Sequence, residues 1–273
     1  MKRTRDNYRS RVAHFVRKRP ELLLSPLVFI LFVGSWELIV DEFRISPIIL
    51  PAPSRIVVAL FRDISGSLPH HFLITFYETG AGFVLGAAIG LLLGGLIAQS
   101  PLLERTLYPY VVAFQTVPKV AMAPLMVIWF GYGLSSKIVI TATIAFFPVL
   151  ANTIAGLRAT PADQLELMEA IRAGRWRTLW KVRLPNALPY ILVGLDVAVV
   201  LSVIGAIVGE FVGAREGLGY LIMQRNFSMD VAGVFGILIV LALMGVTLHL
   251  AMRLLQRKFL FWTDTHQDNV TGS

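Results

Sequence analysis

Four ionisable side chains lie inside long apolar stretches of the sequence: Glu78, Lys119, Asp196 and Glu210. A charge at the centre of a membrane helix costs roughly 2.5 to 3.5 kcal/mol on insertion scales. We therefore expect these side chains to face protein or water rather than lipid. Such groups exchange protons, pair with one another or contact a polar solute, so they are the first candidates for function.

Lys119 lies beside prolines that should interrupt its apolar segment. It follows Pro118, and Pro124 comes about one and a half turns later. Proline removes helical hydrogen bonds, so we expect a broken helix whose freed carbonyl groups line a cavity. Two roles stay open for Lys119: a place on a solute path, or a structural pairing with Asp196 or Glu210.

Glu210 precedes Gly213 and Gly217. It is interpreted either as part of an outer gate or docking contact, or as a residue of the outer membrane interface. Gln115 and Asn152 are candidates for uncharged hydrogen bonds to a solute. The predicted translocation path contains Gln115, Lys119, Asn152, Asp196 and Glu210.

The composition is that of a membrane protein. The chain is 56% hydrophobic and 15% charged, whereas soluble domains carry roughly 25% charged residues. A spanning helix needs roughly 20 apolar residues, and windows of that kind lie at about 21–40, 72–97, 107–130, 137–157, 187–212 and 231–252. The sequence predicts an all-α polytopic membrane protein with six transmembrane helices in a single domain, residues 21–257.

Catalytic chemistry is not expected. The sequence has no cysteine, which excludes disulfides and thiolate sites. His249 has no second metal-binding residue at helical spacing, so it is interpreted as a packed or interfacial side chain. No Gly-x-x-x-x-Gly-Lys-Ser/Thr phosphate loop occurs in the sequence. We predict no enzyme activity, catalytic residue, metal or cofactor.

The basic residues predict the orientation, because cytoplasmic segments are enriched in lysine and arginine. With both termini cytoplasmic, 18 of these residues lie inside and six outside. This predicts a cytoplasmic leader at 1–20, a cytoplasmic loop at 158–186 and a cytoplasmic tail at 258–273. The outer residues 55–61 are too short to span and should form a helix at the membrane surface.

The second span carries Gly82, Gly86, Gly90 and Gly94 at four-residue spacing. This makes one smooth helix face that another helix can approach closely. We predict helix packing there, against a helix of either the same chain or a second copy.

The loop at 158–186 has the pattern of a helical hairpin. Thr160 followed by Pro161 is a typical helix start, and the helix should end near Ile171. Gly174 then weakens the helix, and a second basic and aromatic turn follows. The hairpin is expected to lie across the cytoplasmic ends of the spans.

One stripe of the first hairpin helix is apolar, with Leu165, Met168 and Ile171, and a neighbouring stripe carries Glu166 and Glu169. The residues alone leave two interpretations. The hairpin is either a surface for a partner protein or an amphipathic loop on the lipid surface, anchored by its tryptophan and arginine side chains.

This loop resembles the signature of bacterial ABC importer permeases, a Glu-Ala-Ala start with Gly at the seventh position and Leu-Pro about a dozen residues later. Alignment on Leu184-Pro185 places the motif Glu at Glu166 and the motif Gly at Arg172. A second register, starting at Glu169 and using Gly174, spoils the distance to Leu-Pro. The first register is preferred, with the bend left open to a shift toward Gly174.

Further motifs are similar to those of nitrate, sulfonate and taurine importer permeases, over roughly residues 50–260. The similar stretches are Pro118 to Leu125, Trp129 to Gly133, Phe146 to Pro148, Gly209 to Gly213 and Glu216 to Tyr220. The resemblance implies a type I ABC importer permease fold in the bacterial inner membrane. It also implies a second permease copy, separate ATPase subunits and an external solute-binding protein as partners.

In this family the hairpin seats in a groove of the ATPase, which implies coupling contacts at Leu165, Glu166, Met168, Glu169, Arg172 and Gly174. The residues of these motifs most resemble those of permeases for pyrimidine precursors or riboflavin, and the family resemblance also includes sulfonate, taurine and nitrate as solutes.

The alternative function is a carrier driven by an ion gradient through Glu78, Asp196 and Glu210. Such carriers commonly show internal repeats, and none is visible in this sequence.

Overall fold

The computed structural model describes residues 21–260, so the predicted leader and most of the predicted tail lie outside the described residues. The described part is helical, without a β-strand. Five of its helices are long and apolar enough to cross a membrane, and a sharply bent pair adds a sixth candidate. The elements are α2 (Glu21–Glu42), α3 (Pro53–Ile64), α4 (Leu68–Ile97), α5 (Pro101–Thr116), α6 (Lys119–Phe130), α7 (Leu134–Arg158), α8 (Ala162–Ala170), α9 (Arg175–Thr178), the π-helical turn η1 (Leu179–Arg183), α10 (Leu184–Gly213), α11 (Leu218–Phe227) and α12 (Val231–Phe259).

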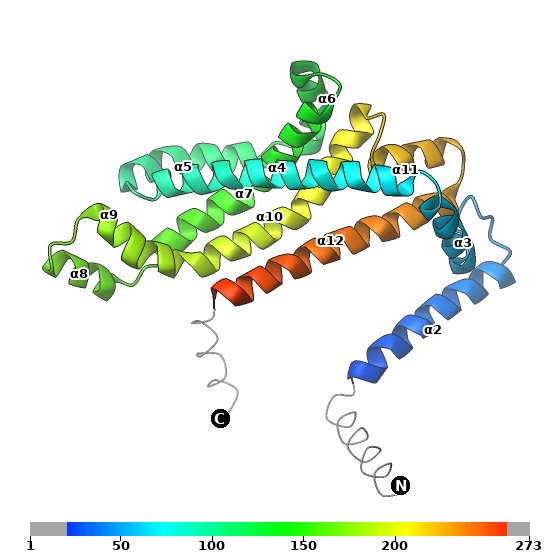
Figure 1. Cartoon of the computed structure of the whole chain (residues 1–273), viewed down its shortest axis with the longest axis horizontal. Helices are drawn as coiled ribbons and strands as arrows, with labels where there is room; N and C mark the ends of the chain where they lie inside the picture. Colours follow the sequence, from blue (N-terminus) through cyan, green and yellow to red (C-terminus); the bar gives the residue numbers. More distant parts are fainter. Residues whose placement is uncertain (1–20, 261–273) are drawn as a thin grey trace, which may run out of the picture. The chain divides into compact units, whose positions relative to one another are not determined.

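The larger of two compact units, residues 64–224 and 237–260 of the described chain, is built around α4, α7 and α10. α7 packs extensively against both α4 and α10, and the three helices lie side by side (Figure 1). Small side chains fill part of this centre, including Ala87, Ala145 and Ala198, which are almost fully buried. Small residues let helix backbones approach closely, which stabilises helices packed in a membrane.

The predicted break near Pro118 is present. α5 ends at Thr116, α6 begins at Lys119, and the two axes differ by 92°. Val117, which precedes Pro118, is extended with φ −65° and ψ 126°, as expected because the proline ring disfavours the helical conformation of the residue before it. The third apolar segment is therefore two helices at a steep angle.

The smaller unit contains residues 21–63 and 225–236. α3 covers the predicted surface helix and is longer than the predicted 55–61. Its first turn is held by Glu37 of α2, whose carboxylate accepts the Ser54 hydroxyl at 2.6 Å and the Ser54 backbone N–H at 3.0 Å. Exposed apolar side chains cover much of α2, which suits a helix facing lipid.

An ion-pair network closes this smaller unit. Arg225 contacts Asp63 at 2.5 Å and Asp230 at 3.1 Å, and Arg62 contacts Asp230 at 2.8 Å. The Asp230 carboxylate raises the pKa of Arg62. Burial acts to raise the pKa of Asp230, but the Gly233 backbone N–H and Arg62 outweigh it, and this pKa is lowered. Both charged forms are thereby favoured.

Candidate functional site

The hairpin at 158–186 contains the predicted first helix, α8, but the helix start differs in detail. Pro161 occupies the N-cap position with an extended ψ of 141°. The Thr160 hydroxyl donates instead to the carbonyl oxygen of Leu157 at 3.3 Å. Pro161 is therefore the N-cap rather than the first helical residue, and the Thr160 side chain completes the end of α7.

α8 ends in a left-handed turn at Arg172, where φ is 52°. The Arg172 N–H donates to the Glu169 carbonyl oxygen and the Ala173 N–H to that of Met168, both at 2.8 Å. This pair of bonds is the Schellman pattern, in which the left-handed residue is most often glycine. Gly174 is extended, with φ −64° and ψ 154°. The left-handed residue is thus at the position aligned with the motif Gly, and the bend has not moved to Gly174.

Arg172→Gly should stabilise the hairpin slightly. A left-handed conformation costs a non-glycine residue roughly 1 to 2 kcal/mol, and the greater freedom of glycine in the unfolded chain offsets part of this gain. We expect an equal or higher Tm of the purified protein. A clear loss of Tm would show that the Arg172 side chain supplies a contact that outweighs the strain.

The exposed face of α8 differs from the apolar stripe predicted for it. Met168 is only 8% exposed, while Leu167 and Ile171 are 63% and 62% exposed. Glu166 and Glu169 are also exposed. Met168 therefore packs within the chain, and the surface available to a partner combines carboxylates with Leu167 and Ile171. Ile171 leaves the predicted stripe because α8 ends before it.

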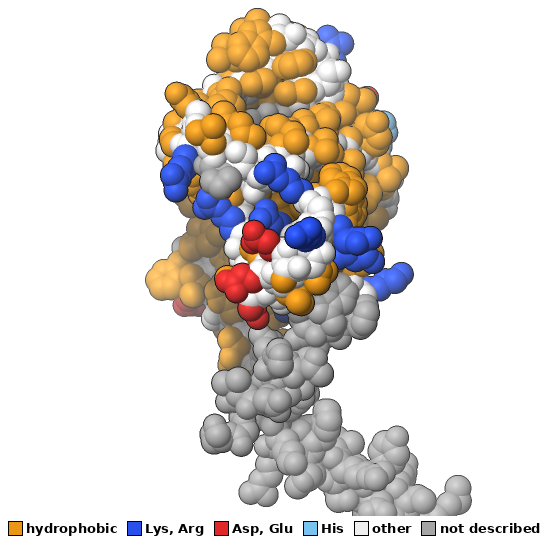
Figure 2. Space-filling view, turned by 90° about the vertical axis from the view of Figure 1, so that its left-hand side faces the viewer, with side chains coloured by type: hydrophobic (Ala, Val, Ile, Leu, Met, Phe, Trp, Pro, Cys, Tyr) orange, Lys and Arg blue, Asp and Glu red, His pale blue; other side chains and the backbone are white. Residues whose placement is uncertain are grey.

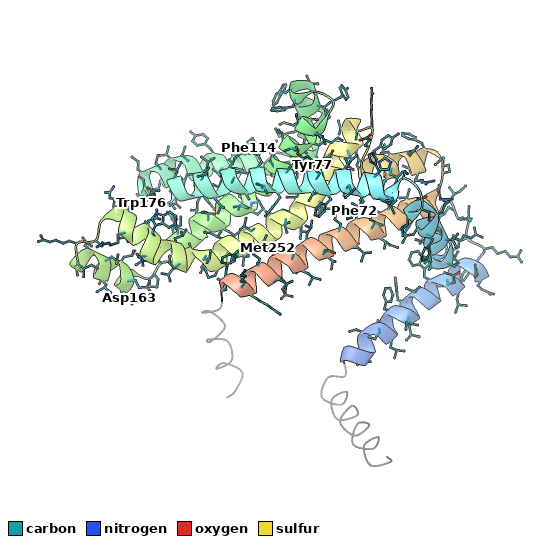
Figure 3. All side chains as sticks on the ribbon, viewed as in Figure 1. Phe72, Tyr77, Phe114, Asp163, Trp176 and Met252 are labelled. Carbon is teal, nitrogen blue, oxygen red and sulfur yellow. The ribbon has the colours of Figure 1, made fainter. Side chains whose placement is uncertain are left out.

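Charge is divided between the two arms of the hairpin. Asp163 lies on α8 and Trp176 on α9 (Figure 3). Figure 2 views this end of the chain and shows acidic side chains gathered together, flanked by lysine and arginine side chains. The basic arm contains Arg175, Arg177, Lys181 and Arg183. The acidic side chains and the exposed Leu167 therefore lie on α8, Ile171 caps its end, and the basic side chains lie on the other arm.

The hairpin is tied to the spans at its base. The Asn186 side-chain amide of α10 donates to Gln164 Oε1 of α8 at 2.7 Å and to the Val182 carbonyl oxygen at 2.8 Å. A hollow of about 630 Å³ lies between the hairpin and the α4–α5 connection, with Leu103 and Met168 among its lining residues. A displacement of α8 can therefore be transmitted to α10 through the Gln164–Asn186 hydrogen bond.

The four glycines of α4 lie against α7 of the same chain. A Cβ atom at Gly86 would lie 2.5 Å from the Ala142 carbonyl oxygen, and one at Gly90 would lie 2.8 Å from that of Phe146. Thr141 and Thr153 occupy the corresponding space at Gly82 and Gly94. The neighbour left open by the sequence is therefore internal.

Lys119 is half-buried at the break between α5 and α6. Its ammonium group donates to the backbone carbonyl oxygen of Gln115 at 3.3 Å. Asp196 and Glu210 have other partners in the described chain, so the suggested pairing of Lys119 with either of them is wrong. Within the described part of the chain, Lys119 and Gln115 are the only two predicted path residues that share a hydrogen bond.

The remaining predicted path residues make separate hydrogen bonds. Asp196 Oδ1 is 2.8 Å from His249 Nδ1 of α12. The Asn152 amide donates to the Pro148 carbonyl oxygen at 2.8 Å. His249 is thus a partly exposed histidine with a carboxylate partner, which its sequence spacing alone could not reveal.

A buried ionic cluster at the beginning of α7 includes Lys137, one of the six residues counted as outside. Lys137 Nζ is 2.8 Å from Glu78 Oε1, and these residues are 6% and 0% exposed. Glu210, 2% exposed, accepts the Thr75 hydroxyl at 2.6 Å and the backbone N–H of Gly219. Lys137 begins the predicted span at 137–157, but neither this span nor the orientation count indicated that its side chain is buried against Glu78.

Several known proteins are similar to this chain. It is 37% identical over 247 residues to the formylaminopyrimidine transport permease protein ThiX of Halalkalibacterium halodurans, covering 90% of this chain and 98% of ThiX. The putative aliphatic sulfonates transport permease protein SsuC of Bacillus subtilis is 35% identical, with 93% and 95% covered. The riboflavin transport system permease protein RibX of Chloroflexus aurantiacus is 37% identical, with 87% and 89% covered.

The fold is also similar to that of solved transporters. A chain of the inward-facing MetNI methionine ABC transporter superposes with a TM-score of 0.63 at 24% identity, over 70% of this chain and 95% of that chain. The architecture is that of a type I ABC importer permease. Residues 86–261 match the family described as the binding-protein-dependent transport system inner membrane component. The chain therefore belongs to this family and is a multi-pass inner-membrane permease subunit of an ABC importer.

Proposed function

We propose that this permease receives movement from a separate ATPase subunit through the hairpin at 158–186 and converts it into alternating access of a solute path. The permease itself is not catalytic, and ATP hydrolysis belongs to the ATPase subunit of such importers. Closure of the ATPases would move α8, and the spans attached to it would open the path outward. Hydrolysis would then reset the path inward.

The observation that carries this proposal is the exposed face of α8 together with its attachment to α10. Glu166, Leu167 and Ile171 are all exposed, and apolar side chains surrounded by charge are typical of protein interfaces. The Gln164–Asn186 hydrogen bond of 2.7 Å links the same helix to α10. A contact on α8 can therefore be transmitted to a spanning helix.

Replacing Glu166 with Lys should reduce solute uptake at least tenfold while the permease still folds. The exposed carboxylate would become a like charge toward the basic groups we expect on the ATPase, and repulsion at an interface costs several kcal/mol. Uptake in cells and the amount of ATPase copurified in mild detergent are the measurements. Glu42→Lys, at the exposed C-terminal end of α2, is the matched control. Full uptake and full ATPase recovery with Glu166→Lys would contradict the proposal.

For the assembly, we propose a homodimer of permeases with two ATPase subunits and an extracytoplasmic solute-binding protein. Both termini and the hairpin would be cytoplasmic, with residues 21–257 as one permease domain. The excess of lysine and arginine in the proposed inner segments supports this orientation. The exposed apolar surfaces of the described helices leave room for lipid and for a second copy.

For the solute path, we propose the region around the α5–α6 break. Lys119 and Gln115 lie together there, and broken helices expose backbone groups that a polar solute can contact. The relatives are named for formylaminopyrimidine, aliphatic sulfonates and riboflavin. We propose a small organic or anionic nutrient of the pyrimidine-precursor, riboflavin, sulfonate, taurine or nitrate class. A binding screen of the cognate external protein with these compounds tests this choice, and binding of an unrelated solute alone would overturn it.

A further inference from the structure

Three buried ionisable groups of the larger unit lie near the beginning of α7 and the end of α10. Glu78 of α4, Lys137 of α7 and Glu210 of α10 are 0%, 6% and 2% exposed. The three residues come from the three helices that pack most closely together. Any imbalance of charge here lies in the packed interior, where an uncompensated charge is costly.

The charges of this cluster do not balance if all three groups are ionised. Lys137 supplies one positive charge and bonds to Glu78 Oε1 at 2.8 Å. His71 supplies none, because its Nδ1 accepts the Gly217 N–H at 3.0 Å and the ring is therefore neutral. Arg215 and Glu216, on the α10–α11 connection, are both exposed and offset each other. Two carboxylates with one ammonium group would leave a net negative charge.

The hydrogen bonds around the two carboxyl groups require one more donor. Glu210 binds Thr75, which lies three residues before Glu78 on the same face of α4, and an ionised carboxylate only accepts hydrogen bonds. Glu78 Oε2 is buried and has no N–H or O–H donor among the described residues. Both oxygens of Glu210 already accept, from Thr75 and from Gly219. A proton bound between these two neighbouring carboxyl groups would supply the donor that Glu78 Oε2 lacks.

We propose that Glu78 and Glu210 share one proton, so that the Glu78–Lys137–Glu210 cluster is a proton-binding site and is neutral as a whole. Two adjacent carboxyl groups in a buried site bind a proton readily, because like charges at close range cannot both be ionised. The bound proton satisfies Glu78 Oε2 and removes the net charge in the same step.

The proton also stabilises the connection between α10 and α11. Glu210 holds the Gly219 N–H, and Thr75 accepts the Leu218 N–H at 2.7 Å while donating to Glu210. While the cluster is neutral, Glu210 and the Leu218 backbone stay bound to Thr75 of α4. A hollow of about 490 Å³, lined by Lys137, Tyr132, Arg215 and Glu216 among others, lies beside the cluster and allows exchange with water. Loss of the proton would leave repulsion between Glu78 and Glu210 and loosen this connection.

Charge-balanced variants of the full-length protein test the site. In Glu78→Gln and in Glu210→Gln an amide N–H replaces the proton, and Lys137 pairs with the remaining carboxylate. Both variants should fold with the yield of the unsubstituted protein. Glu78→Gln/Glu210→Gln should lose most of the folded yield, because Lys137 is then buried without a counter-charge. Adding Lys137→Met to this pair should restore the yield.

Infrared difference spectra provide the readout that packing alone would not change. The unsubstituted protein at neutral pH should show the carbonyl stretch of a protonated carboxylic acid, shifted in D2O, and each single Gln variant should lose it. Absence of this band, or its persistence in both single variants, would overturn the proposal. Single Gln variants with higher folded yield and no band in the unsubstituted protein would show an ionised cluster instead.

Discussion

Gly86→Leu should prevent α4 from packing on α7 and so remove most of the folded permease. A Cβ atom at Gly86 would lie 2.5 Å from the backbone carbonyl oxygen of Ala142, and a backbone atom cannot move aside as a flexible side chain can. Over-packing costs about 1 to 3 kcal/mol and more where backbone must shift. A loss of about 3 kcal/mol corresponds to more than a hundredfold change in the folding equilibrium. The yield of monodisperse protein in mild detergent measures this effect.

Gly80→Leu is the matched control, because the same substitution on the same helix meets no atom within 4 Å of its Cβ. Leucine is a better helix former than glycine, so this variant should fold as well as the unsubstituted chain. Equal losses for Gly86→Leu and Gly80→Leu would show that the close approach of α4 to α7 is not what makes the glycines necessary.

Arg225→Met should destabilise the smaller unit by up to about 3 kcal/mol, because removal of one partner leaves a buried charge without compensation. Asp63 is 5% exposed and contacts Arg225 at 2.5 Å. Its other ion-pair contact in the described chain, to Arg62, is longer at 3.4 Å. We expect a Tm several degrees lower and faster proteolysis around α3.

Arg55→Met is the control for Arg225→Met. Arg55 lies on α3 as well but is exposed, and exposed charges contribute little to stability. The Tm of the Arg55→Met variant should equal that of the unsubstituted protein within experimental error. If Arg225→Met behaved like Arg55→Met, the ion pair with Asp63 would not stabilise the unit.

Local sequence rules predicted much of the fold. The apolar windows at 72–97 and 137–157 correspond to α4 and α7 with end differences of a few residues, because a spanning helix has a composition visible in a short window. The interruption at Pro118 follows from the covalent structure of proline. The four-residue spacing of the α4 glycines likewise indicated close packing before the neighbouring helix was known.

Contacts between distant segments were not predictable from such windows. Glu78 and Lys137 are 59 residues apart in sequence, and the position of Lys137 at the edge of the apolar window 137–157 gave no sign of a buried partner. The separate pairing of Asp196 with His249 depends on how α10 and α12 meet. Met168 and Ile171 were assigned to one stripe, and they separate because the turn at Arg172 ends α8 before Ile171.

Cysteine cross-linking to the ATPase tests the central claim, that α8 docks on the ATPase through its exposed face. The natural sequence contains no cysteine, so each variant carries a single reactive thiol on the permease. With a short thiol-to-amine cross-linker and the coexpressed ATPase, Leu167→Cys and Ile171→Cys should form a permease–ATPase adduct, and the buried Met168→Cys should not. Adducts from Met168→Cys alone, or none from any position in a complex that copurifies, would contradict this account.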